Sequence, residues 1–383
     1  MSSFLTIVFV FAFLTSDLGT CSSEVVNSTR GGKDGISGGS CAQGFGVCCI
    51  FSVGCGAIVS ENCTYLVQSS TSSPTPDPCF FNICKASSNI CRIRLDFATF
   101  SIAGPTVGTT VVGADETNGP VVGDCLTDTF SVSSPGNTAS PVICGFNSGQ
   151  HMIVDASNEC NRAIFNFDGT GSTRQFDIKV TQYKCGDENG GPDGCLQYFT
   201  GNFGSVASYN FPTTASAIGD TTTHLSNQCY TICFRQELGK CGICFGTAIP
   251  GGAATMDQGS FGLSIPPAAA LTGSQDLGCS NDYLQIPGAE RDAASPNNFE
   301  VGTVGAIAHE RICGRFFGFA AIAGVIGAAN NDESICTQQR PFRVIFKTDA
   351  DEMTGAASPE TNEAEGFPGG IIGFLLNFAL QDC

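Results

Sequence analysis

The stretch Cys279-Ser280-Asn281-Asp282-Tyr283-Leu284-Gln285-Ile286-Pro287 joins a half-cystine, an aspartate three residues later and a short alternating segment. Alternation of apolar and polar residues is typical of a β-strand with one buried face. The order Cys-x-x-Asp, strand and Cys-Gly occurs twice, at Cys125, Asp128 and Cys144 and at Cys279, Asp282 and Cys313. This partial repeat predicts two related β-domains.

Cysteine content indicates the compartment. The 383 residues include 22 cysteines and only 3 histidines, which favours disulfides over zinc sites. Disulfides persist in oxidising compartments, and the apolar run Phe4 to Leu14 within residues 1–20 predicts a signal peptide. We therefore expect a secreted, extracellular protein. The triplets Asn27-Ser28-Thr29 and Asn62-Cys63-Thr64 predict a glycoprotein, with N-glycosylation at Asn27 and Asn62.

Composition also restricts fold class and partners. A formal net charge of -18 disfavours nucleic acids and anionic membrane surfaces. The chain has 48 glycines, 17 prolines, 30 phenylalanines and no long segment with a helical period, which predicts an all-β protein. The apolar run Ile371 to Leu380 predicts a closing strand rather than an anchor, so no membrane span is expected.

Composition shifts divide the chain into five parts. After residues 1–20, a segment at 21–60 is rich in cysteine and glycine and needs disulfides because it cannot bury a core. A first β-domain at 61–185 is followed by a polar, glycine-rich linker at 186–194. A second β-domain at 195–383 is long for one sandwich, which indicates inserted loops, particularly at 246–278.

Four further segments, at 41–51, 93–97, 144–151 and 195–201, follow in an order that resembles secreted arthropod CUB-domain proteins. The resemblance implies two antiparallel jelly-roll β-sandwiches preceded by a small disulfide-rich segment. It also implies the disulfides Cys125–Cys144 and Cys279–Cys313, and the pairing of Cys195 with Cys229 or Cys233.

Many CUB domains hold calcium, which takes several oxygen ligands. Two aspartates and a glutamate eight residues before the first of them form that site. Asp282 and Asp349 match the aspartates, whereas the glutamate position falls on Ser274, with Asp276 as a substitute. In the first domain Asp128 alone matches well. The open alternative is that Asp282 and Asp128 accept backbone hydrogen bonds in turns.

No catalytic constellation is visible in the sequence. The histidines lie far apart, and Cys241-Gly242-Ile243-Cys244 is interpreted as structural half-cystines. The sequence therefore predicts a non-catalytic extracellular binding module that recognises a protein or glycan partner through loops around Asp282 and Asp349, with calcium as a candidate cofactor. The alternatives are a structural component of extracellular matrix or cuticle and, less favoured, an accessory partner of an extracellular protease.

Overall fold

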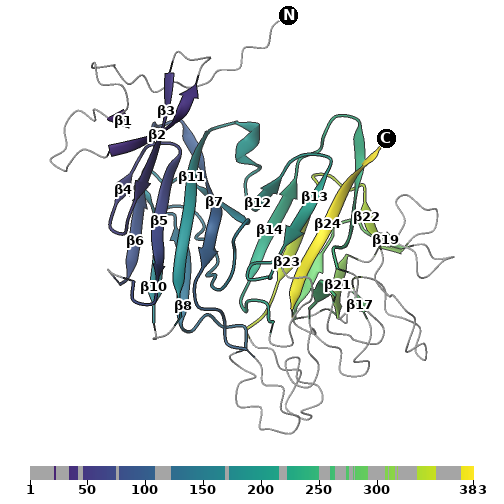
Figure 1. Cartoon of the computed structure of the whole chain (residues 1–383). Coiled ribbons are helices and arrows are strands. Elements are labelled where there is room, and N and C mark those ends of the chain that lie inside the picture. Colours follow the sequence, from purple (N-terminus) through teal and green to yellow (C-terminus); the bar gives the residue numbers. More distant parts are fainter. Residues whose placement is uncertain are drawn as a thin grey trace, which may run out of the picture.

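The computed structural model describes residues 21–22, 34–41, 46–74, 77–107, 122–168, 172–214, 222–249, 259–263, 273–275, 279, 281–291, 307–308, 310–314, 317, 334–350 and 372–383. The regular elements described there are β-strands and a single 3-10 turn, η3 (Glu188–Gly190). They form two β-sandwiches that lie side by side (Figure 1). The all-β, two-sandwich prediction is confirmed.

The first sandwich contains β1 (Cys21–Ser22), β2 (Asp34–Cys41), β3 (Gly46–Val53), β4 (Ile58–Val59), β5 (Thr64–Thr71), β6 (Cys79–Ile83), β7 (Ile90–Ser101), β8 (Asp128–Ser133), β9 (His151–Asp155), β10 (Asn161–Phe167) and β11 (Arg174–Lys184). Its sheets have the orders β1-β2-β3-β5-β11-β7-β9 and β4-β6-β10-β8. Because β3 pairs with β5, part of the cysteine-rich range 21–60 belongs to this sandwich.

The second sandwich contains β12 (Cys195–Phe199), β13 (Phe203–Ala207), β14 (Cys229–Phe234), β15 (Lys240–Thr247), β16 (Phe261–Gly262), β17 (Gly273–Gln275), β18 (Tyr283–Gln285), β21 (Arg311–Gly314), β22 (Ile335–Thr337), β23 (Arg343–Lys347) and β24 (Gly373–Asp382). Its sheets have the orders β12-β14-β23-β18-β21-β17 and β13-β24-β15-β22. A small separate ribbon pairs β19 (Glu290–Arg291) with β20 (Ile307–Ala308).

Alternation of side chains explains the long strands. In β7, Ile93, Leu95 and Phe97 are buried. Arg94 and Asp96, between them, point outward and form an ion pair. Phenylalanines fill much of the interior where a tryptophan-free chain needs large apolar side chains.

The two Cys-x-x-Asp motifs do not occupy equivalent strands. Asp128 begins β8, which is at the edge of the four-stranded sheet and pairs with β10. Asp282 precedes β18, which is inside the six-stranded sheet between β23 and β21. The sequence repeat therefore extends to the motif but not to the sheet position.

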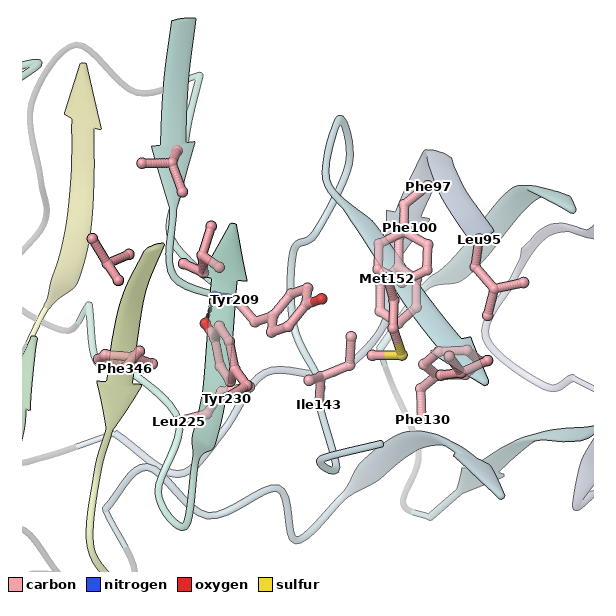
Figure 2. Close-up of a cluster of buried hydrophobic side chains, with 14 of the residues drawn as sticks. Leu95, Phe97, Phe100, Phe130, Ile143, Met152, Tyr209, Leu225, Tyr230 and Phe346 are labelled. Atoms are coloured by element: carbon pink, nitrogen blue, oxygen red, sulfur yellow. Dashed lines mark hydrogen bonds between the residues drawn. The ribbon is translucent and has the colours of Figure 1, made fainter. Parts of the chain in front are cut away.

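The apolar cores of the two sandwiches are continuous (Figure 2). Figure 2 shows Ile143 and Tyr209 lying between Phe130 of the first sandwich and Tyr230 of the second. The Tyr209 hydroxyl donates to the His151 carbonyl at 2.8 Å, and its ring lies 5.3 Å from that of Tyr230. Independent domain motion is the default only where an interface is small or polar, so this shared core favours a fixed pair.

The expected linker is fastened to the first sandwich by Arg92. The Arg92 guanidinium is buried, pairs with Asp155 and donates to the carbonyls of Gly190, Pro192 and Cys195 at 3.4, 3.0 and 3.1 Å. The bonds to Gly190 and Pro192 tie the 186–194 range to strand β7, and the bond to Cys195 ties the start of β12 to it. The linker thus acts as part of the interface.

Polar contacts complete the interface. Asn210 donates its amide N–H to Asn147 Oδ1 at 2.8 Å and accepts from the Phe146 amide at 3.2 Å. Gly145 has a φ of +76°, and a Cβ added there would collide with the Asn210 side chain. Glycine at 145 therefore permits both the backbone conformation and the close approach of the sandwiches.

Eight disulfides join described cysteines: Cys55–Cys79, Cys84–Cys160, Cys91–Cys185, Cys125–Cys144, Cys195–Cys233, Cys241–Cys383, Cys244–Cys336 and Cys279–Cys313. They include the pairs 125–144 and 279–313 that the resemblance implied. Of the two alternatives for Cys195, the structure has Cys233, and the choice of Cys229 is wrong. Cys195 and Cys233 are buried together, whereas Cys229 is exposed as a free thiol at the start of β14.

Candidate functional site

Asp282 and Asp349, the two expected site residues of the second sandwich, lie next to each other. The Asp349 backbone amide donates to Asp282 Oδ1 at 2.7 Å, although the residues are 67 positions apart. Asp282 is fully buried just before β18, close to the Cys279–Cys313 disulfide. Asp349 follows β23, so the hydrogen bond joins the ends of two paired strands.

His224 is the buried neighbour that sequence reasoning missed. Its Nε2 lies 3.8 Å from Asp282 Oδ2, and both side chains are fully buried. Burial lowers the pKa of His224 to about 4, so the imidazole is neutral at neutral pH. No sequence pattern could have found this neighbour, because His224 and Asp282 come from distant segments without a shared motif.

The segment 223–228 connects this site to the first sandwich. Asn227 donates to the Asp349 carbonyl at 2.6 Å, and Thr348 Oγ1 donates to the Leu225 carbonyl at 2.7 Å. On its other side, the Ser226 amide donates to the Gly123 carbonyl at 3.0 Å. The loop end that contains Asp282 and Asp349 therefore adjoins the interface between the sandwiches.

The described residues account for only part of a calcium site. Asp276 lies outside the described residues, and Ser274 is described only as backbone of β17. Within the described ranges, no group of three or more His, Cys, Asp or Glu side chains could hold a metal ion. Asp282 also accepts a backbone hydrogen bond, as in the alternative to calcium. The structure therefore brings Asp282 and Asp349 together, and their role as calcium ligands stays a prediction.

Asp128, the corresponding aspartate of the first sandwich, already has an internal cation. Arg174 Nε and Nη2 donate to its two carboxylate oxygens at 2.8 Å each, and both side chains are buried. The Ala103 amide also donates to Asp128 Oδ2 at 2.8 Å. The hydrogen bonds to Asp128 raise the pKa of Arg174, which keeps the guanidinium charged. Both Asp128 carboxylate oxygens thus accept hydrogen bonds from donors within the first sandwich.

Of the two candidate glycosylation sites, Asn27 and Asn62, the structure describes only Asn62. Asn27 lies outside the described residues. Asn62 is exposed just before β5, and its Oδ1 accepts from the Gln182 amide at 2.8 Å. A glycan on the side-chain nitrogen of Asn62 would leave this acceptor oxygen in place. Glycosylation of Asn62 is therefore compatible with the local hydrogen bonding and remains a prediction.

Family comparison gives one match. Residues 192–381 match the family model described as "Animal CUB domain". These findings support a CUB-domain protein. The matched region begins within the expected linker and ends near the chain terminus, so it contains Asp282 and Asp349 of the second sandwich. No enzymatic family is indicated, and CUB domains are generally non-catalytic modules.

Solved structures with a likeness to this chain include the CUB1-EGF-CUB2 domains of rat MASP-1, at 13% identity and a TM-score of 0.22, covering 84% of this chain and 99% of that one. The human MASP-1/3 CUB1-EGF-CUB2 domain gives 14% identity, a TM-score of 0.22 and coverages of 82% and 99%. The MASP-1 CUB2 domain bound to Ca2+ has 14% identity and a TM-score of 0.24, and the match covers 33% of this chain and 98% of that one. No curated protein matches. Likenesses this weak carry no functional conclusion.

In the part of the chain that the structure describes, no helix has the length and apolar character needed to cross a membrane.

Proposed function

We propose that the protein is a secreted, non-catalytic binding module that recognises an extracellular protein through the loop end of its second sandwich. The observation that carries the proposal is the hydrogen bond from the Asp349 amide to Asp282 Oδ1, which joins two distant loops into one structured end. Loops that a rigid sandwich holds in place commonly carry binding residues. A carboxylate at this end suits a lysine or arginine of the partner.

Calcium would strengthen this recognition by ordering the same loops. Asp349 would be a ligand, Asp282 a second, and Asp276 the third carboxylate that the resemblance suggests. When bound, the ion would neutralise the carboxylates that face it and fix the loops that carry them. Oxygen atoms not used by the ion would remain available to a cationic side chain of the partner.

Asp349→Asn is the variant that tests this proposal. It keeps the backbone amide that bonds to Asp282, whereas a substitution of the buried Asp282 would disturb folding. We expect millimolar calcium to stabilise the secreted protein and chelator to reverse the effect. Calcium at about 100 times its dissociation constant adds about 2.7 kcal/mol to the free energy of unfolding. Asp349→Asn should lose most of that gain.

Asp193→Asn is the matched control, because the charge change is the same and the fully exposed Asp193 carboxylate has only a long contact of 3.9 Å with Arg92 Nη1, which adds little stability at an exposed site. Binding to a panel of purified extracellular proteins then tests recognition directly. Loss of binding in Asp349→Asn but not in Asp193→Asn supports the proposed site. Equal binding by both variants would place recognition elsewhere, whatever the calcium result.

A further inference from the structure

Strand β23 presents positive charge on the outer face of the six-stranded sheet. Its inward residues Val344 and Phe346 are buried, while Arg343 is exposed and Lys347 is half-buried. Arg340, just before the strand, is also exposed. Side chains alternate along a strand, so Arg343 and Lys347 share the outward face and lie about 13 Å apart along it.

A second cation lies beside Lys347. Arg311 of β21 lies 4.5 Å from the centre of the Tyr283 ring, and Lys347 Nζ lies 5.4 Å from the same ring. Tyr283 is opposite Lys347 in the sheet register, and Gln285 is opposite Arg311. Attraction between each cation and the ring offsets the repulsion between the two positive charges. We call Arg340, Arg343, Lys347 and Arg311 the cationic strip.

Three cations of the cationic strip have no carboxylate partner among the described ion pairs. Across the described residues, no ion pair involves Arg340, Arg343 or Lys347. Two other described cations of this sandwich pair with carboxylates, as Arg235–Glu237 and Lys240–Asp382.

Two carboxylates lie near the cationic strip. Glu310, next to Arg311 in the chain, accepts hydrogen bonds from Gln285 Nε2 and the Gly288 amide at 3.0 and 3.1 Å. Asp349 follows the end of β23. Neither forms a described ion pair with Arg340, Arg343 or Lys347, so these three cations retain their capacity to bind an external anion.

We propose that the cationic strip binds a sulfated polysaccharide. The cations lie along one strand and its neighbours. Several sulfates of one extended polysaccharide chain can span the distance between them. Guanidinium groups bind tetrahedral oxyanions through paired N–H donors, which suits sulfate. The net charge of -18 does not prevent this binding, because charges beyond about 8 Å are largely screened at physiological ionic strength.

This surface differs from the one in the proposed function. The loop end offers the Asp349 carboxylate to a cationic protein partner, whereas the cationic strip offers cations to a polyanion. Calcium has no part in the second interaction. Chelator should therefore leave polysaccharide binding unchanged, so the two proposals can fail separately.

The test measures binding of the full-length secreted protein to immobilised heparin at several salt concentrations, with unsulfated hyaluronan as the comparison polysaccharide. The strip variant combines Arg340→Gln, Arg343→Gln and Lys347→Gln. Each exposed charge pair contributes modestly, so losing three should weaken heparin binding by about tenfold. Binding should also become less sensitive to salt, because fewer counterions are released.

The control variant makes the same change in net charge on the first sandwich, with Lys85→Gln, Arg162→Gln and Lys184→Gln. Arg162 and Lys184 are exposed and Lys85 is half-buried, and none forms a described ion pair. Control binding should stay within about twofold of the original, which separates a local surface from overall charge. Thermal unfolding of both variants confirms that each remains folded.

Three results would overturn the proposal. The unaltered protein could show no binding to heparin at physiological salt, or the two triple variants could lose binding equally. Tighter binding of poly-glutamate than of heparin would instead assign the cationic strip to an acidic protein.

Discussion

Removal of the Arg174 guanidinium tests the arrangement at Asp128 most directly. Arg174 is 1% exposed and Asp128 is 0% exposed, and two hydrogen bonds of 2.8 Å join them. In Arg174→Met the apolar chain length is nearly kept, but the Asp128 carboxylate stays buried with only the Ala103 amide as a described donor. Removing one partner of a buried ion pair costs about 3–5 kcal/mol, because the other charge is left uncompensated.

The magnitude can be checked by urea unfolding of the purified protein. We expect the free energy of unfolding to fall by about 3–5 kcal/mol in Arg174→Met. A change of 1 kcal/mol shifts the melting temperature by about 2–4 °C in a domain of 150–250 residues. The melting temperature of Arg174→Met should therefore fall by on the order of 10 °C.

The double variant Asp128→Asn with Arg174→Met separates charge from packing. It removes the buried charge with little change in shape, so it should be more stable than Arg174→Met alone. A cost below about 1 kcal/mol for Arg174→Met, or a double variant no more stable than the single one, would refute the internal ion pair as the reason that Asp128 is satisfied.

The remaining predictions concern the interface, pH and a thiol. Tyr209→Phe removes the hydroxyl that donates to the His151 carbonyl, so it should lower stability by about 1–2 kcal/mol in calorimetry while a single transition is retained. Burial lowers the pKa of His151 to about 3 and of His224 to about 4, below the usual 6.5. The unfolded state then binds more protons, so urea unfolding should show stability falling as pH drops from about 6.5 towards 4. A maleimide should label Cys229 in the folded protein, whereas Cys233 should react only after reduction, as mass spectrometry of the peptides would show.

Local patterns predicted the parts of the fold that depend on local chemistry. Alternation at Ile93, Leu95 and Phe97 predicted the buried face of β7 because side-chain direction along a strand follows from the backbone alone. The nearness of Asp282 and Asp349 came from the resemblance to CUB domains, since no spacing rule brings residues 67 positions apart together.

The rest depended on packing between distant segments. Arg174 is 46 positions from Asp128, and nothing near either residue distinguishes it from an ordinary exposed charge. Cys229 and Cys233 begin and nearly end the same short strand, so only their burial decides which one meets Cys195. The interface was also invisible in the sequence, because the linker composition indicates a flexible connection whereas Arg92 fastens it.

Both proposed surfaces lie on the second sandwich, and this placement constrains how they act together. The cationic strip runs along β23, and Asp349 follows the end of that same strand. The segment 223–228 connects Asp349 to Gly123 of the first sandwich, and the two apolar cores are continuous. A ligand on the loop end and a polysaccharide on the strip would therefore be held at a fixed spacing on one rigid body. Simultaneous binding of both should depend on whether a partner matches that spacing, because both surfaces lie along and after one strand of a single sandwich.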